Sequence, residues 1–316
     1  MKFERTHDIS DFVEGKDRTL LIVNPASGRG RGRKVFARME SSLREAFPKI
    51  DVRFSEFPGH SFQLGREAVR ERFTRIICLG GDGTPFEVVN GMYLQGRPEF
   101  LPEIGIIPAG TGNSFLLDFG IGTPEEALRR ISAGRRVKVD LIEFEYQLDG
   151  RTERRYSLNL IGVGLITDIL KLANDWLKFM RSFGYSLAVL IRLAKGMHNK
   201  IDLEADGRGW SVVNSALVVS NSKYTGGKMK IAPHAETSDG KADLVVFRDV
   251  NRREMIQIFK GVFSGAHAAH PKVEMIQGVK MTVVGTPDLN VMADGEVLGK
   301  TPLRINLLPQ ELTFLG

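Results

Sequence analysis

Three glycine-rich loops constrain the fold of this chain, because each comes directly after a short run of apolar residues. The runs are residues 19–23, 75–79 and 104–107. A short apolar run that stops at asparagine, glycine or proline is typical of a buried strand. Helical patterns follow the first two loops, and strands that alternate with helices predict a mostly parallel sheet with helices on both faces. In such sheets ligands bind beyond the carboxyl ends of the strands, where these loops lie.

The composition narrows the class of protein. With 316 residues, 42% hydrophobic and 26% charged, the chain is large enough for two domains and is neither disordered nor fibrous. The single cysteine, Cys78, lies in an apolar run, which predicts a buried thiol and a reducing, cytoplasmic setting. We expect no secretory signal and no membrane span, because no apolar run approaches about 20 residues. The net charge of +6 favours an anionic partner: nucleic acid, anionic membrane or nucleotide phosphate.

The second half of the chain has a different pattern. From about Arg136, short strand patterns are separated by Gly, Asn and Asp turns, which predicts a β-sandwich or an open barrel. A helical block at residues 165–197, apolar with interleaved Lys and Arg, interrupts these strands. We therefore predict an α/β domain at residues 1–136 and a β-sandwich domain at residues 137–316.

The loops themselves have the chemistry of a phosphate site. Glycine at a strand-to-helix turn leaves backbone amides open to phosphate. The first loop, residues 24–28, is followed by four cations, but it is neither a P-loop nor a dinucleotide fingerprint. In the second loop Asp82 offers a carboxylate to Mg²⁺ or a ribose, and the Thr84–Glu87 spacing predicts a capping box. Any one loop is also compatible with a plain surface turn; three at successive strand ends favour a phosphate site.

Four motifs in a fixed order carry a family resemblance. They are Asn-Pro-x-Ser-Gly at residues 24–28, Gly-Gly-Asp-Gly-Thr at 80–84, Pro-x-Gly-Thr-x-Asn at 108–113 and Asp-Gly-Glu at 294–296. This set resembles the diacylglycerol kinase catalytic family, which includes soluble bacterial diacylglycerol kinases, sphingosine kinases and ceramide kinases. The resemblance runs from Leu20 to the end of the chain. It implies the two-domain fold shared with NAD kinases: a three-layer α/β domain that binds the nucleotide at residues 1–136, and a β-sandwich that binds the lipid and carries the catalytic base at residues 137–316, with its last segment returning to the first domain. It also implies ATP-dependent phosphorylation of a lipid hydroxyl.

The resemblance also implies site residues. Asp294 would be the general base that takes the proton of the lipid hydroxyl, with Glu296 as the second catalytic carboxylate; the alternative is that Asp294 only forms a hairpin turn. The nucleotide would be bound by residues of the three loops and of short segments beside them: Asn24, Pro25, Ala26, Ser27, Gly28, Ser55, Gly80, Gly81, Asp82, Gly83, Thr84, Glu87, Thr111 and Asn113.

A magnesium loop is implied near residue 239. Asp239 would give its carboxylate and Glu236 and Lys241 their carbonyls, while Asp140 would link the metal to Asp82. The alternative is a plain Asp-Gly turn. The sequence departs from the family at three further positions, since Ser114 replaces an aspartate, Phe86 replaces a polar residue and Pro85 is unusual.

The expected partners are ATP, Mg²⁺ and a lipid at a membrane surface. Residues 165–197 either contact the membrane peripherally or pack on the sandwich. No RNA-binding motif accompanies the basic charge, so we expect no nucleic acid, and a homodimer is compatible with the sequence. Two alternatives stay open, namely a kinase of a soluble acceptor such as NAD and a non-catalytic module that binds nucleotide or lipid. The sequence leaves the identity of the lipid open.

Overall fold

The first part of the chain is a parallel sheet between helices. The structure is a computed structural model that describes residues 18–164, 167, 199–213 and 216–316. Its first four strands are parallel, in the order β2-β1-β3-β4. They are β1 (Thr19–Val23), β2 (Asp51–Phe54), β3 (Arg75–Gly80) and β4 (Glu103–Pro108). Strands β1 and β3 are buried along their whole length, as expected where helices cover both faces.

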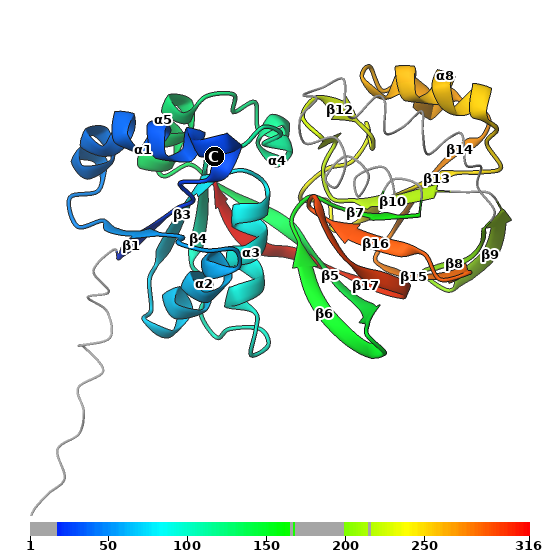
Figure 1. Ribbon diagram of the computed structural model, residues 1–316, viewed down its shortest axis with the longest axis horizontal. Helices are drawn as coiled ribbons and strands as arrows, with labels where there is room; N and C mark the ends of the chain where they lie inside the picture. Colours follow the sequence, from blue (N-terminus) through cyan, green and yellow to red (C-terminus); the bar gives the residue numbers. More distant parts are fainter. Residues whose placement is uncertain (1–17, 165–166, 168–198, 214–215) are drawn as a thin grey trace, which may run out of the picture.

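Five helices complete the described part of this domain. In Figure 1, α1 and α5 lie on one side of the sheet and α2 and α3 on the other, which confirms the predicted three layers. Helix α5 begins where the Thr123 hydroxyl accepts the Glu126 N–H and proline occupies the first turn. The helices are α1 (Ser27–Ala46), α2 (His60–Arg70), α3 (Gly83–Met92), α4 (Ser114–Asp118) and α5 (Pro124–Ser132).

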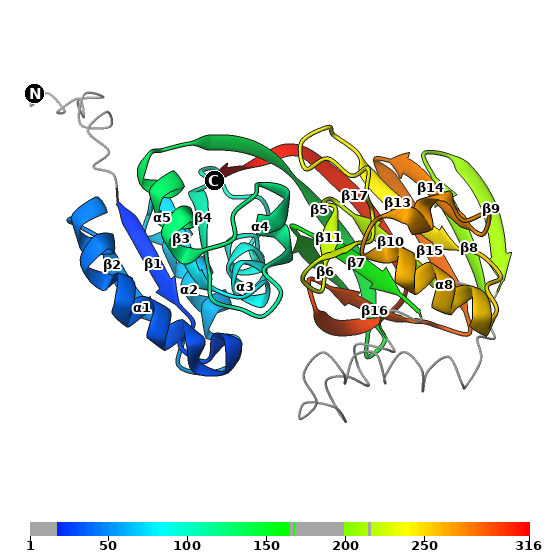
Figure 2. The ribbon, with the colours of Figure 1, turned by 90° about the horizontal axis from the view of Figure 1, so that it is seen from above.

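Two long strands join this sheet to the second domain. Strands β5 (Arg136–Leu148) and β17 (Glu296–Leu315) are antiparallel neighbours and cross together between the domains (Figure 2). The end of β17 pairs in parallel with β4, so both domains share one continuous sheet. A register shift between Leu308 and Leu312 marks the crossing, and the Asp140 carboxylate accepts the Gln310 N–H there at 2.6 Å. A bulge of this kind bends a strand without ending it.

The second domain is a sandwich of two layers. One layer contains β7, β10, β13, β14 and β16, and the other contains β5, β6, β8, β9, β15 and β17. Alternate residues of both layers form the shared core. The strands are β6 (Arg151–Ser157), β7 (Leu160–Val163), β8 (Lys200–Ala205), β9 (Arg208–Val213), β10 (Ala216–Ser220), β13 (Ala242–Phe247), β14 (Val273–Gly278), β15 (Lys280–Thr286) and β16 (Asn290–Ala293), with a small hairpin of β11 (Tyr224–Thr225) and β12 (Met229–Lys230).

The fold class is confirmed, but several elements differ from the sequence-based expectation. Helix α8 (Arg252–Val262) was not predicted; it covers the outer face of one sandwich layer and begins with a capping box of Asn251 and Glu254. Helix α1 starts at Ser27, earlier than expected, after which three successive residues have positive φ. The predicted helical block at residues 165–197 lies outside the described residues, Thr167 excepted.

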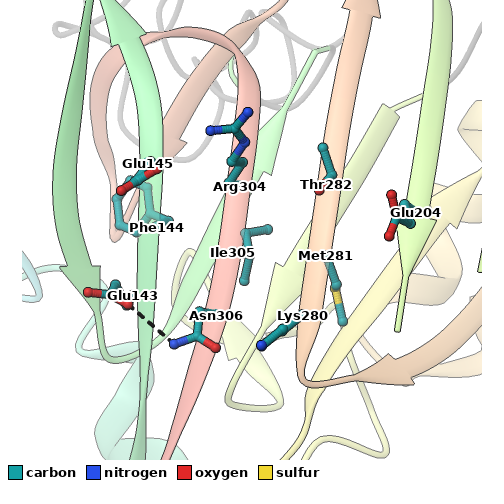
Figure 3. A pocket seen from close by; sticks show the side chains of 10 residues that line it. All are labelled: Glu143, Phe144, Glu145, Glu204, Lys280, Met281, Thr282, Arg304, Ile305 and Asn306. Carbon is teal, nitrogen blue, oxygen red and sulfur yellow. Dashed lines mark hydrogen bonds between the residues drawn. The ribbon is translucent and has the colours of Figure 1, made fainter. Parts of the chain in front are cut away.

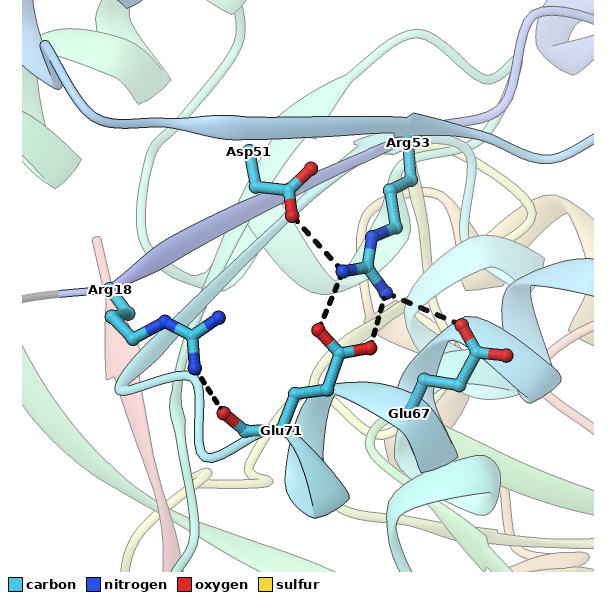
Figure 4. A network of polar contacts seen from close by, with 5 residues as sticks. All are labelled: Arg18, Asp51, Arg53, Glu67 and Glu71. Carbon is cyan, nitrogen blue, oxygen red and sulfur yellow. Dashed lines mark hydrogen bonds and ion pairs between the residues drawn. The ribbon is translucent and has the colours of Figure 1, made fainter.

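A cluster of charges fixes the edge strand β2 to helix α2. Arg53 contacts both carboxylate oxygens of Glu71, at 2.9 and 2.7 Å, and also reaches Asp51 and Glu67 (Figure 4). Its guanidinium hydrogen bonds hold the pKa of Glu71 below its usual range. A two-point contact of this kind is geometrically restrictive. It therefore positions the end of β2, from which the segment with Ser55 continues.

Candidate functional site

The three glycine-rich loops pack directly against one another. A Cβ atom on Gly28 would lie 2.3 Å from the carbonyl oxygen of Ala109, and a Cβ on Gly110 would lie 2.3 Å from the Cα of Gly81. The hydroxyl of Ser27 is also close to Gly81. No side chain fits at such distances, so two of the glycines are required for contact between the loops. The sequence predicted open amides for phosphate; the structure adds that the loops form one surface.

Asparagine side chains tie the loops internally. The carboxamide oxygen of Asn24 accepts the N–H groups of Ala26 and Ser27, and its nitrogen donates to the Thr84 hydroxyl at 3.2 Å. Asn113 has a positive φ of 51° and bonds Gly110 in both directions. The first loop is thus hydrogen-bonded to the second, and the third is closed on itself.

The predicted capping box is wrong. Asp82 precedes α3, no side chain caps this helix, and Thr84 is buried inside its first turn, bonded to Asn24. The Glu87 carboxylate instead lies at the start of α2, where hydrogen bonding from Gly59, Ser61 and Phe62 favours its charged form and lowers its pKa. Burial outweighs this effect and raises the pKa of Glu87, and the nearby charge of Glu296 adds to this shift. Thr84 and Glu87 have the spacing of a capping box, but the carboxylate of Glu87 interacts with the N-terminus of α2 and not with that of its own helix, α3.

A cleft of about 690 Å³ opens beside the first loop. Phe57 is 49% exposed at this cleft and stacks on His60, with 4.5 Å between ring centroids. His60 accepts the N–H of Glu56 and so holds the segment after β2. Five residues expected at the nucleotide line the cleft, namely Asn24, Pro25, Ala26, Ser55 and Glu87. Thr111, also expected there, is exposed on the third loop.

Asp294 lies at the turn between β16 and β17, buried under four hydrogen-bond donors. The backbone φ angles are 47° at Asp294 and 95° at Gly295, so the residue does form a tight turn. Its Oδ1 accepts the Ser157 hydroxyl at 2.8 Å and the N–H groups of Asn159 and Leu160, while the Leu158 N–H is the only donor to Oδ2 from the described residues. The carboxylate is therefore fixed in orientation, and Oδ2 keeps a free lone pair.

The surroundings of Asp294 disfavour the charged form of its carboxylate. Burial raises the pKa of Asp294 to about 6, partly offset by its hydrogen bonds, and the negative charge of Asp82 raises it further. Asp294 therefore lies close enough to Asp82, in the second loop, for the charge of Asp82 to raise its pKa. Glu296 lies there as well, since its Oε1 is 3.4 Å from the position of a Cβ on Gly83. The structure thus brings both predicted catalytic carboxylates to the loops.

Ser114 holds Asp82 and contacts the sandwich. Its N–H donates to the Asp82 carboxylate at 2.8 Å, and its hydroxyl accepts the N–H of Gly227 at 3.1 Å. Asp118, one helix turn further on, accepts the N–H of Lys223. The departure from the family at Ser114 therefore leaves a contact between the two domains in place. Phe86, the second departure, packs into the sandwich core instead of facing a nucleotide.

The predicted magnesium loop is present as a tight turn. The Asp239 carboxylate accepts the Lys241 N–H at 3.0 Å, and Asp140 accepts the Gly240 N–H at 2.8 Å. Among the described residues, no three His, Cys, Asp or Glu side chains gather closely enough to hold a metal alone. Nor does any hydrogen bond between described residues join Asp140 directly to Asp82.

One buried atom beside this loop lacks a partner. The Oδ2 atom of Asp243 is buried and has no hydrogen-bond partner in the part of the chain that the structure describes. Asp243 pairs across the strands with Gln277, whose amide contacts Asp239 at 3.4 Å. A buried carboxylate oxygen without a donor is costly unless a cation or water satisfies it. The oxygen-rich surroundings of this loop therefore fit Mg²⁺.

A second hollow, of about 380 Å³, lies on the outer face of the sandwich (Figure 3). Residues of both charges line it, among them the acidic Glu145 and Glu204 and the basic Lys280 and Arg304. It shares no lining residue with the loops or with the Asp294 turn. We therefore place the candidate site at the loops.

Comparison with known proteins decides the family. A model of the diacylglycerol kinase catalytic domain matches residues 18–144, and a model of the YegS C-terminal NAD kinase beta sandwich-like domain matches residues 159–316. The chain belongs to the diacylglycerol kinase-like family of lipid kinases. This membership agrees with the resemblance drawn from the four motifs. Within the described residues, no helix is both long and apolar enough to cross a membrane.

Relatives of this lipid kinase match it over nearly its whole length. The diacylglycerol kinase of Staphylococcus carnosus is 26% identical over 303 residues, which cover 94% of each chain. That of Bacillus subtilis is 27% identical over 289 residues, covering 90% of this chain and 91% of the relative. A Bacillus anthracis structure assigned to the diacylglycerol kinases superposes with a TM-score of 0.76 at 24% identity, covering 95% and 96%. Yeast NADH kinase complexed with NADH shares the fold, with a TM-score of 0.54 at 10% identity, covering 95% and 83%.

Sequence reasoning missed some residues of this site. Ser157 and the N–H groups after it hold Asp294 from more than 130 positions away, and no local pattern marks them. Arg31, which donates to the Ala109 carbonyl at the loop junction, was noted only as one of several cations. Both roles arise from the packing of distant segments.

Proposed function

We propose that this lipid kinase transfers the γ-phosphoryl group of ATP to the hydroxyl of a lipid, with Mg²⁺ and with Asp294 as the general base. The observation that supports this most is the position of Asp294. It is a buried carboxylate with one lightly bonded oxygen, next to the glycine-rich loops and close enough to Asp82 for their charges to interact. A general base needs a pKa near neutral pH and a fixed geometry, and the raised pKa and the hydrogen bonds of Asp294 support this role.

The chemistry then follows from positioning and charge. The lipid hydroxyl oxygen forms a bond to the γ-phosphorus while the bond from that phosphorus to the bridging oxygen breaks, and ADP leaves. The hydroxyl proton passes to Oδ2 of Asp294 and then to water. The loop amides face the phosphates, and the cleft beside Ser55 and Glu87 receives the nucleoside.

Magnesium would be held by the Asp239 carboxylate and the carbonyls of Glu236 and Lys241. The metal supplies positive charge and fixes the loop that it binds. The protein residues around it, Asp140 and Asp243, would hold that loop against the sandwich. We further propose that the protein works in the cytoplasm at a membrane surface, because the lipid resides there and the chain carries a charge of +6.

A labelling assay with an acceptor panel tests this function. Purified full-length protein is incubated with γ-labelled ATP, Mg²⁺ and, separately, diacylglycerol, sphingosine, ceramide or NAD, and the products are separated by thin-layer chromatography. We expect label in one lipid product, which also identifies the substrate. Label in NAD alone would show a kinase of a soluble acceptor, and label in none of them would contradict the proposal.

A further inference from the structure

The candidate site is rich in negative charge. Four carboxylates gather around the second loop, from Asp82, Glu87, Asp294 and Glu296. ATP would add about four negative charges, of which an Mg²⁺ ion bound to the nucleotide itself would offset two. Carboxylates that repel the substrate require cations nearby, since phosphoryl transfer depends on neutralising the charge of the γ-phosphate.

Arg31 is a cation fixed where two of the loops meet. Its Nε donates to the carbonyl of Ala109 at 3.0 Å. The same carbonyl lies 2.3 Å from the Cβ position of Gly28, and Arg31 itself is within 3.3 Å of that position. The guanidinium is thereby tethered at the contact between the first and third loops. Among described residues, its two Nη atoms form no hydrogen bond or ion pair, and the residue is exposed.

From this geometry we infer that Arg31 binds the β- and γ-phosphates of the nucleotide and so determines selectivity for ATP over nucleotides with fewer phosphates. This inference rests on the proposed function. Anchoring through Nε leaves a fork of two Nη groups, the geometry that binds two phosphate oxygens at once. Arg38, further along helix α1, differs because it pairs with Glu125 at 2.8 Å, away from the loops.

A glutamine variant separates charge from anchoring. The Nε2 atom of glutamine is as many bonds from the backbone as the Nε of arginine, so Arg31→Gln can keep the bond to Ala109 while it removes the Nη fork. A residue that only ties α1 to the third loop would tolerate this change. A residue that binds phosphate would not. Arg38→Ala on the same helix is the matched control, and thermal unfolding verifies that each variant folds.

The experiment measures the affinity of ATP, ADP and AMP for the wild-type protein and each variant by calorimetry, with Mg²⁺ present. For Arg31→Gln we expect ATP to bind about 10- to 100-fold more weakly while AMP changes less than about threefold. Arg38→Ala should leave all three unchanged. An equal loss for all three nucleotides, or no loss for ATP, would overturn the role of Arg31. If the wild-type protein bound no nucleotide, the proposed function would fail instead.

Discussion

Replacing Asp294 by asparagine distinguishes a catalytic carboxylate from a turn residue. Asparagine keeps the size and the turn geometry but cannot take a proton. Oδ1 can still accept from Ser157, Asn159 and Leu160, whereas the new NH₂ group points at the N–H of Leu158, which it cannot bond. The substitution therefore changes charge and one hydrogen bond, and little else.

The effect on stability is the difference of two terms. In the folded state the pKa of Asp294 rises from 3.8 to about 6, so the ionised carboxylate destabilises the fold once pH passes this range. At pH 7 this cost is about 3 kcal/mol, and asparagine removes it. The unbonded Leu158 N–H costs roughly 1–3 kcal/mol. We therefore expect the free energy of unfolding of Asp294→Asn to equal or slightly exceed that of the wild type.

The effect on catalysis is far larger. Loss of a general base typically lowers kcat about 10²- to 10⁴-fold, which labelled ATP and the preferred lipid would measure. Asp206→Asn is a matched control. Asp206 begins another Asp-Gly turn with positive φ and accepts the N–H groups of Val279 and Lys280, on the far side of the sandwich. These bonds lower the pKa of Asp206, so this variant should lose stability but keep its kcat.

Two outcomes would refute this reasoning. If Asp294→Asn kept kcat within about threefold of the wild type, Asp294 would not be the base. If it instead unfolded as readily as Asp206→Asn, with activity lost in proportion to folded protein, the carboxylate would be a turn residue. Urea unfolding at pH 7 and kinetics on the same preparations separate these cases.

Three further substitutions or additions test other parts of the site. Gly110→Ala places a Cβ 2.3 Å from Gly81, so it should lower stability by about 2–4 kcal/mol in urea unfolding, whereas Gly122→Ala, with open space, should change it by less than about 0.5; equal effects would contradict the packing of the loops. Added Mg²⁺ should raise the melting temperature of the wild type but not of Asp239→Asn; a shift in both would place the metal elsewhere. Ser157→Ala removes a donor that lowers the pKa of Asp294, so the pH–rate midpoint should move to higher pH, and an unmoved midpoint would disprove this contact.

Local patterns predicted the elements that local forces determine. The apolar runs at β1 and β3 are buried strands, and Cys78 is fully buried with its pKa raised to about 12 by burial. The loops follow these strands as expected, because short segments of the sequence are enough to predict the alternation of strands and helices. The Asn251–Glu254 capping box of α8 had the same kind of local signal, but the surrounding strand pattern obscured it.

The features that could not be predicted from the sequence depend on contacts between residues far apart in the chain. Strand β17 reaches β4 only because its last residues pair with Ile104 and Gly105, far away in sequence. Glu87 does not cap α3 as expected, because α2 packs against α3 and brings its N-terminus close to the Glu87 carboxylate. The burial of Asp294 under Ser157 likewise depends on two strands that meet across 137 positions. Motif order alone indicated that Asp294 and Asp82 share a site.

The most direct test of the central claim is the pH dependence of phosphoryl transfer in a single turnover of the wild-type protein. The pKa of Asp294, raised to about 6 by burial, predicts a rate that increases about tenfold per pH unit below this value and levels off above it. The Asp294→Asn variant should show a slow rate without this dependence. A wild-type rate that stays constant from pH 5 to 8 would contradict proton transfer to this carboxylate.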